Sequence, residues 1–137
     1  MPISYRIKKE DGIVICRHEG KTGDREFVDT YKSLFEHPDY TKGFNQFVDL
    51  RLAQCTGRSA EALRAIADLV ELHYAGSGQR TKTAIVAPND LSYGLARMYG
   101  FLSDPSLEEV EIFRDVHKAA DWLGVSAQLL EVSRDGG

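Results

Sequence analysis

Polar side chains follow three apolar segments of the chain, and their types and positions suit them to hold a ligand. These side chains are Asp49 and Arg51, Asn89 and Asp90, and Arg114. If the apolar segments are parallel strands, their carboxyl ends meet at one edge of the sheet, where ligands of open α/β proteins bind. Helix N-termini open on that edge and present unpaired N–H groups and a positive dipole end. With Arg58 nearby, the edge suits a carboxylate or a phosphate.

A simpler interpretation of the same residues also stands. Asn89, Asp90 and Asp115 occupy positions where helix N-caps are routine. The arginines are then solvated or paired with Asp49. The pattern therefore predicts a location for binding and assigns no activity to it.

No catalytic or metal-binding motif accompanies these residues. The four histidines lack the spacing of a zinc site, no serine stands in G-x-S-x-G, and residues 20–23 lack the earlier glycine of a phosphate-binding loop. We therefore predict no catalytic residue, no metal and no cofactor. A small enzyme that uses Asp49 or Asp90 as a base is kept as an alternative.

Length and composition favour one soluble domain. The chain has 137 residues, a net charge of −4 and interspersed charges, which argues against nucleic acid or an anionic membrane as the main partner. It has neither a membrane-spanning apolar segment nor the apolar core of a signal peptide, so we expect a cytoplasmic protein. Its two cysteines, Cys16 and Cys55, are expected to be buried free thiols.

The elements that position the polar residues are organised around residues 44–51. Phe47 and Val48 are adjacent and apolar, and neighbouring strand residues point to opposite faces, so this segment is predicted to be a strand covered on both sides. Before it, residues 3–8 and 13–18 form a predicted hairpin closed by an Asp-Gly turn. Thr22 is placed to cap the following helix.

After the central strand, helices and strands alternate. A helix is predicted from Ser59, a good N-cap, to Tyr74, and strands at 81–87 and 110–113 are each followed by a helix. The order is β-β-α-β-α-β-α-β-α. It predicts a single α/β domain with a mixed five-stranded sheet, antiparallel at the N-terminal hairpin and parallel afterwards, and about four helices.

Four segments of the chain resemble the SpoIIAA-like proteins of the STAS superfamily. They are Phe-Val-Asp-Leu-Arg at 47–51, the run 83–91, the run 93–99, and Ile-Phe-Arg-Asp at 112–115 with the helix up to Gly124. The resemblance covers residues 5–124 and implies a STAS-like fold in an uncharacterised bacterial protein. It predicts a SpoIIAA-like domain at 1–125 and an extension at 126–137, made of a short helix and a frayed tail.

The resemblance also bears on regulation. Anti-sigma-factor antagonists of the superfamily carry an Asp-Ser phosphorylation motif where the helix after the central strand begins. Residues 55–59 read Cys-Thr-Gly-Arg-Ser and contain no Asp-Ser pair. Ser59 is better explained as a helix N-cap than as a phosphorylation site, so the antagonist role is not favoured.

A second candidate site is an apolar cavity, which the resemblance suggests through related lipid-binding folds. Tyr93, Met98, Tyr99 and Phe101 stand at helical spacing and offer a lining, although such a set also suits plain core.

Three functions are left open. The leading hypothesis is a non-enzymatic binding or regulatory domain with a small or lipophilic ligand. Its predicted site residues are Asp49, Arg51, Arg58, Asn89, Asp90, Tyr93 and Arg114. The second hypothesis is a module that binds a protein partner or forms a homodimer, and the third is the small enzyme.

Overall fold

The computed structural model describes residues 2–131 and confirms the predicted succession of elements. Strands and α-helices alternate after an N-terminal hairpin whose turn contains a short 3-10 segment, Lys9–Asp11. The elements are β1 (Ile3–Lys8), β2 (Ile13–Lys21), α1 (Asp24–Glu36), β3 (Asn45–Gln54), α2 (Ala60–Tyr74), β4 (Thr81–Val86), α3 (Asp90–Leu102), β5 (Glu108–Phe113), α4 (Val116–Leu123) and α5 (Ala127–Leu130).

The five strands form one mixed sheet in the order β1-β2-β3-β4-β5. β1 pairs with β2 in the antiparallel direction, and every later pairing is parallel, as predicted. β3 therefore lies in the middle of the sheet. The short helix predicted near 125–132 is α5, whereas the predicted frayed tail at 133–137 lies outside the described residues.

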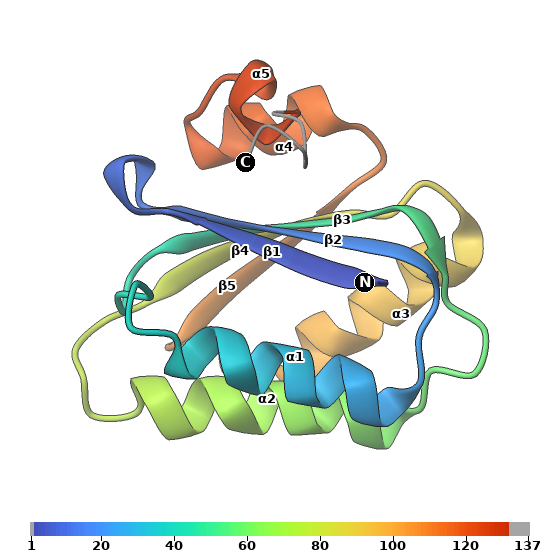
Figure 1. Cartoon of the computed structure of the whole chain (residues 1–137), viewed down its shortest axis with the longest axis horizontal. Coiled ribbons are helices and arrows are strands. Elements are labelled where there is room, and N and C mark those ends of the chain that lie inside the picture. Colours follow the sequence, from blue (N-terminus) through green and yellow to red (C-terminus); the bar gives the residue numbers. More distant parts are fainter. Residues whose placement is uncertain (1, 132–137) are drawn as a thin grey trace.

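Helices cover both faces of the sheet, and each face has its own apolar core. Helices α1, α2 and α3 lie on one face and α4 and α5 on the other (Figure 1). Phe47 packs into the core beneath α4 and α5, and Val48 packs into the core beneath α1–α3. Both side chains are buried, which confirms the prediction of a strand covered on both sides.

The prediction that β3 ends at Arg51 was wrong. The strand continues to Gln54, and its pairing with β2 shifts by one residue between Asp49 and Leu52. This extra residue is a β-bulge, which reverses the alternation of side chains beyond it. Leu52 consequently points to solvent, with 59% of its surface exposed.

Helix N-caps mark where three of the helices begin. The side chains of Ser59, Asn89 and Asp115 accept hydrogen bonds from backbone N–H groups in the first turns of α2, α3 and α4. Thr22 was wrongly predicted as a cap: α1 is preceded by Gly23, which has no side chain to accept a bond. Thr22 is instead a buried residue between β2 and α1.

Candidate functional site

The seven predicted ligand-binding residues do not form one site. They fall into three groups, each held by its own ion pair: Asp49 and Arg51; Arg58; and Asn89, Asp90, Tyr93 and Arg114. The first group lies on the sheet face covered by α4 and α5, and Arg58 lies on the opposite face.

Asp49 is a buried carboxylate between two arginines. Its Oδ2 accepts from Arg17 Nη1 at 3.1 Å and from Arg51 Nη2 at 2.9 Å. Burial acts to raise the pKa of Asp49, but the hydrogen bonds and charges of Arg51 and Arg17 outweigh it and lower that pKa. Arg17 also donates to the carbonyl of Leu130 at 2.6 Å, and Arg51 pairs with Glu131. This group therefore fastens the last helix to the sheet.

Arg58 and Ser59 are both held by Asp24. Arg58 Nη1 donates to Asp24 Oδ1 at 2.8 Å, and the guanidinium lies 4.1 Å from the centre of the Phe27 ring. The Ser59 hydroxyl donates to Asp24 Oδ2 at 2.7 Å while it accepts from the N–H of Ala62. The Ser59 hydroxyl is therefore already used in these two hydrogen bonds. A phosphate on Ser59 would lie against the carboxylate of Asp24.

The third group is an exposed cluster where α3 begins. Arg114 donates to Asp90 at 3.1 Å and to the carbonyl of Pro88, and its guanidinium lies 4.2 Å from the centre of the Tyr93 ring. The Asp90 side chain is 99% exposed, so it stands outside any cleft. Asn89 accepts from the N–H of Ser92 as the helix cap.

The best-formed candidate site is a cavity of about 80 Å³ between the sheet and helices α1–α3. This is several times the volume of roughly 10–15 Å³ that one water molecule needs. Its walls are mainly apolar and include Phe27, Phe35, Val48, Leu50, Leu63, Ile66, Val70 and Ile85. Of the predicted site residues, Arg58 alone contributes to the lining.

The exposed or half-buried lining residues identify the entrance. Gly20, Ala53, Gln54, Cys55 and Arg58 all come from the ends of β2 and β3 or from the loop that leads to α2. Leu95 on α3 is also half-buried, and the remaining lining residues are buried. The entrance therefore lies at the carboxyl ends of these two strands.

Polar side chains from β3, β4 and β5 line the buried inner part. Gln46 and Thr83 are register partners on β3 and β4. Thr83 donates to Glu108 Oε2 at 2.5 Å, and Tyr99 on α3 donates to Glu108 Oε1 at 2.6 Å. Burial raises the pKa of Glu108, although these two hydrogen bonds act to lower it.

A second buried polar group joins β2 to α1. His18 Nε2 and the Tyr31 hydroxyl lie 2.9 Å apart. Burial lowers the pKa of His18 to about 4, with Arg58 adding to the effect, so the imidazole is neutral at pH 7. Burial raises the pKa of Cys16, beside Tyr31, to about 12. A thiol held in its protonated form is a poor nucleophile.

The predicted aromatic lining was largely wrong. Tyr99 lines the cavity, but Phe101 and Met98 are 79% and 40% exposed. Helical spacing correctly placed these residues on one helix but did not show which of them face inward. Cys55 is a free thiol as predicted, yet it is half-buried at the entrance rather than buried.

The inner polar residues belong to no motif, but their positions within the strands indicate that they face the interior. Gln46 alternates with Val48 and Leu50 on β3, and Glu108 alternates with Val110 and Ile112 on β5. A polar residue in register with inward-facing apolar residues must find partners inside the protein or leave a polar atom unsatisfied. Such positions therefore point to an interior polar site.

A solved structure has the same arrangement over most of its length. It is an uncharacterised protein from the DUF3478 family with a SpoIIAA-like fold, from Shewanella loihica PV-4. The match covers 88% of this chain and 91% of that one, with 19% sequence identity and a TM-score of 0.55.

This chain has the SpoIIAA-like, or STAS, fold. At this identity the likeness extends to the fold alone. No protein-family model and no curated protein matches the sequence. The function of this protein must therefore be argued from its own side chains.

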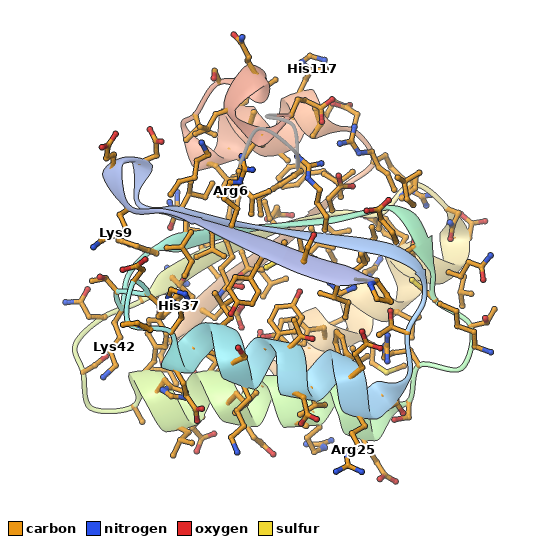
Figure 2. The ribbon with its side chains drawn as sticks, in the orientation of Figure 1. Arg6, Lys9, Arg25, His37, Lys42 and His117 are labelled. Atoms are coloured by element: carbon orange, nitrogen blue, oxygen red, sulfur yellow. The ribbon has the colours of Figure 1, made fainter. Side chains whose placement is uncertain are left out.

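Within residues 2–131, no set of three or more His, Cys, Asp or Glu side chains is grouped to hold a metal ion. His37 and His117, for example, lie on opposite sides of the sheet (Figure 2). None of the helices in the same range is both long and apolar enough to cross a membrane.

Proposed function

We propose that this domain binds a small lipophilic molecule in the cavity between the sheet and helices α1–α3, as a binding rather than a catalytic domain. A cavity with apolar walls, an entrance and a buried polar inner part lies between the sheet and these helices. This observation carries the proposal. Ligand sites in proteins have this combination of apolar walls and a few convergent polar groups.

The charged groups support binding over catalysis. Neither Asp49 nor Asp90 contributes to the cavity lining, so neither is placed to act on a molecule inside it. The His18 imidazole lines the cavity but has a pKa of about 4, which is far from that of a general base working near pH 7.

The proposal is tested by titrating the 15N-labelled protein with 2-methyl-1-hexene, a small apolar probe, and following backbone amide shifts. We expect saturable shifts at residues that line the cavity. Ala96→Leu should abolish them, because Ala96 is a buried lining residue of α3 and the added carbons fill the space. Shifts scattered over the surface, or no shifts with this probe and with its ketone analogue 2-hexanone, would overturn the proposal.

Ala120→Leu is the matched control. Ala120 is equally buried, but it belongs to the core beneath α4 and α5 on the other face of the sheet. The same substitution should overpack that core and destabilise the protein by about 1–3 kcal/mol. Binding of the probe should survive it.

Interaction with a protein partner or a second copy stays a prediction. The exposed side chains Leu72 on α2 and Phe101 on α3 are available for such a contact. Sedimentation velocity at several protein concentrations would detect a homodimer.

A further inference from the structure

One polar group in the cavity differs from all the others that line its inner part. Gln46 is 3% exposed, and within residues 2–131 no acceptor lies within hydrogen-bond distance of its Nε2, although the side chain acts on the nearby hydroxyl of Tyr40, which already pairs with Tyr74. The neighbouring polar groups are satisfied by one another: His18 pairs with Tyr31, and Glu108 accepts from Thr83 and Tyr99. Gln46 is a lining residue of the cavity, and its amide thus keeps an unsatisfied donor there.

An unused buried donor is unfavourable. An amide N–H that is buried without an acceptor loses its hydrogen bond to water and gains none in return. An apolar residue of similar size would have no N–H group to satisfy. Such a residue would also suit this position, because the next residue on the same face of β3 is the apolar core residue Val48. A molecule that supplies an acceptor at this point recovers the lost hydrogen bond.

We propose that the cavity selects neutral lipophilic molecules that carry a carbonyl oxygen, as ketones, esters and amides do, and that Gln46 Nε2 donates to this oxygen. This inference rests on the proposed function, because it names the class of ligand for the same cavity. Gln46 is then the residue that determines specificity.

The surrounding groups explain why the ligand is neutral and offers an acceptor. Burial disfavours a charged ligand, and a carboxylate would also meet the Glu108 carboxyl group in the same cavity. Both oxygens of Glu108 already accept hydrogen bonds, so they are less available to a ligand that donates one. The N–H group of Gln46 is the unused partner.

The experiment compares two probes of the same shape, 2-hexanone and 2-methyl-1-hexene, which differ by an oxygen in place of a CH2 group. Amide shifts of the 15N-labelled protein give both dissociation constants. After correction for the difference in transfer from water to hexadecane, we expect the ketone to bind about fivefold more tightly, the effect of one neutral hydrogen bond. Gln46→Met, which retains the length of the side chain, should remove that preference and leave binding of the alkene intact.

His73→Phe is the control variant, because it also removes a buried nitrogen that has no hydrogen-bond partner within residues 2–131, but at a position outside the cavity. His73 Nε2 is also buried without a partner among the described residues, but His73 does not line the cavity, and its ring stacks on Phe35. This variant should keep the preference for the ketone.

The outcomes separate the two proposals. If neither probe binds in the cavity, the proposed function fails. If both bind with the same corrected affinity, or if Gln46→Met keeps the preference, the cavity binds apolar molecules but Gln46 does not select carbonyl compounds. Tighter binding of 2-hexanol than of 2-hexanone would mean that the cavity offers an acceptor, which also overturns the role of Gln46.

Discussion

The Tyr99 hydroxyl donates a hydrogen bond of 2.6 Å to Glu108 Oε1, and so connects helix α3 to the first residue of strand β5. Glu108 is 2% exposed, and its other oxygen accepts from Thr83 on β4. A buried carboxyl group needs such donors, because burial without them is costly. The pair therefore stabilises the inner end of the cavity and fixes α3 over the sheet.

Removal of this hydroxyl should destabilise the fold. Tyr99→Phe keeps the ring and leaves one oxygen of Glu108 without its donor, so we expect a loss of about 1–3 kcal/mol in the free energy of unfolding. Urea denaturation measures the loss. Tyr5→Phe is the control, since the Tyr5 hydroxyl contacts Ser33 at the surface and its removal should change stability by less than about 0.5 kcal/mol. Equal losses in the two variants would contradict this account of Glu108.

His18 should make the protein less stable in mild acid. Burial lowers its pKa from 6.5 to about 4, so below pH 6.5 the unfolded chain binds a proton that the folded protein excludes. Stability is full above pH 6.5 and falls as the pH falls towards 4. From pH 7 to pH 5 this contribution is about 2 kcal/mol.

The measurement is urea unfolding at pH 7 and pH 5 for the wild type and His18→Gln. Glu108 acts in the opposite direction, because a raised carboxyl pKa makes stability fall as the pH rises above the ordinary value of 4.5. Both proteins contain Glu108, so the difference between them isolates His18. The variant should lose less stability than the wild type at pH 5, and equal losses would refute the prediction.

The sequence was sufficient to predict the architecture because local signals agreed with it. Adjacent apolar residues Phe47 and Val48 indicated the central strand, and Ser59, Asn89 and Asp115 indicated where three helices begin. These features depend on residues within one turn or one strand. The extension of β3 to Gln54 escaped prediction, because the bulge beyond Asp49 depends on pairing with β2.

The site could be located only in part, because the direction of a side chain depends on the register of the whole sheet. The edge at the carboxyl ends of the strands contains the entrance, as the strand-end argument suggested. Asp49 and Arg58, however, lie on opposite faces of the sheet, which their separation in sequence does not show. Gln46 was overlooked because polar residues within strands were not treated as candidates.

Negative charge at Ser59 should destabilise α2. Ser59 Oγ lies 2.7 Å from Asp24 Oδ2, and an acidic side chain would place two carboxylates together. Ser59→Asn and Ser59→Asp both retain a good N-cap, so the comparison isolates the charge. We expect Ser59→Asp to be the less stable at pH 7, by about 1 kcal/mol in urea denaturation. Equal or greater stability of Ser59→Asp would reopen the possibility of a phosphorylation switch at this position.

The ion pairs that fasten α5 should differ greatly in their contribution to stability. The side chain of Asp49 is 8% exposed between Arg17 and Arg51, whereas Glu131, which also pairs with Arg51, is 46% exposed. Asp49→Asn leaves two partly buried cations without their shared anion and should cost about 2–4 kcal/mol. Glu131→Gln removes a solvated pair and should cost less than about 1 kcal/mol.

The lowered pKa of Asp49 means that its contribution is present above pH 3.8 and is lost as the pH falls further. The difference in unfolding free energy between wild type and Asp49→Asn should therefore shrink in acid, and a constant difference from pH 7 to pH 3 would show that the carboxylate charge is not what stabilises this group.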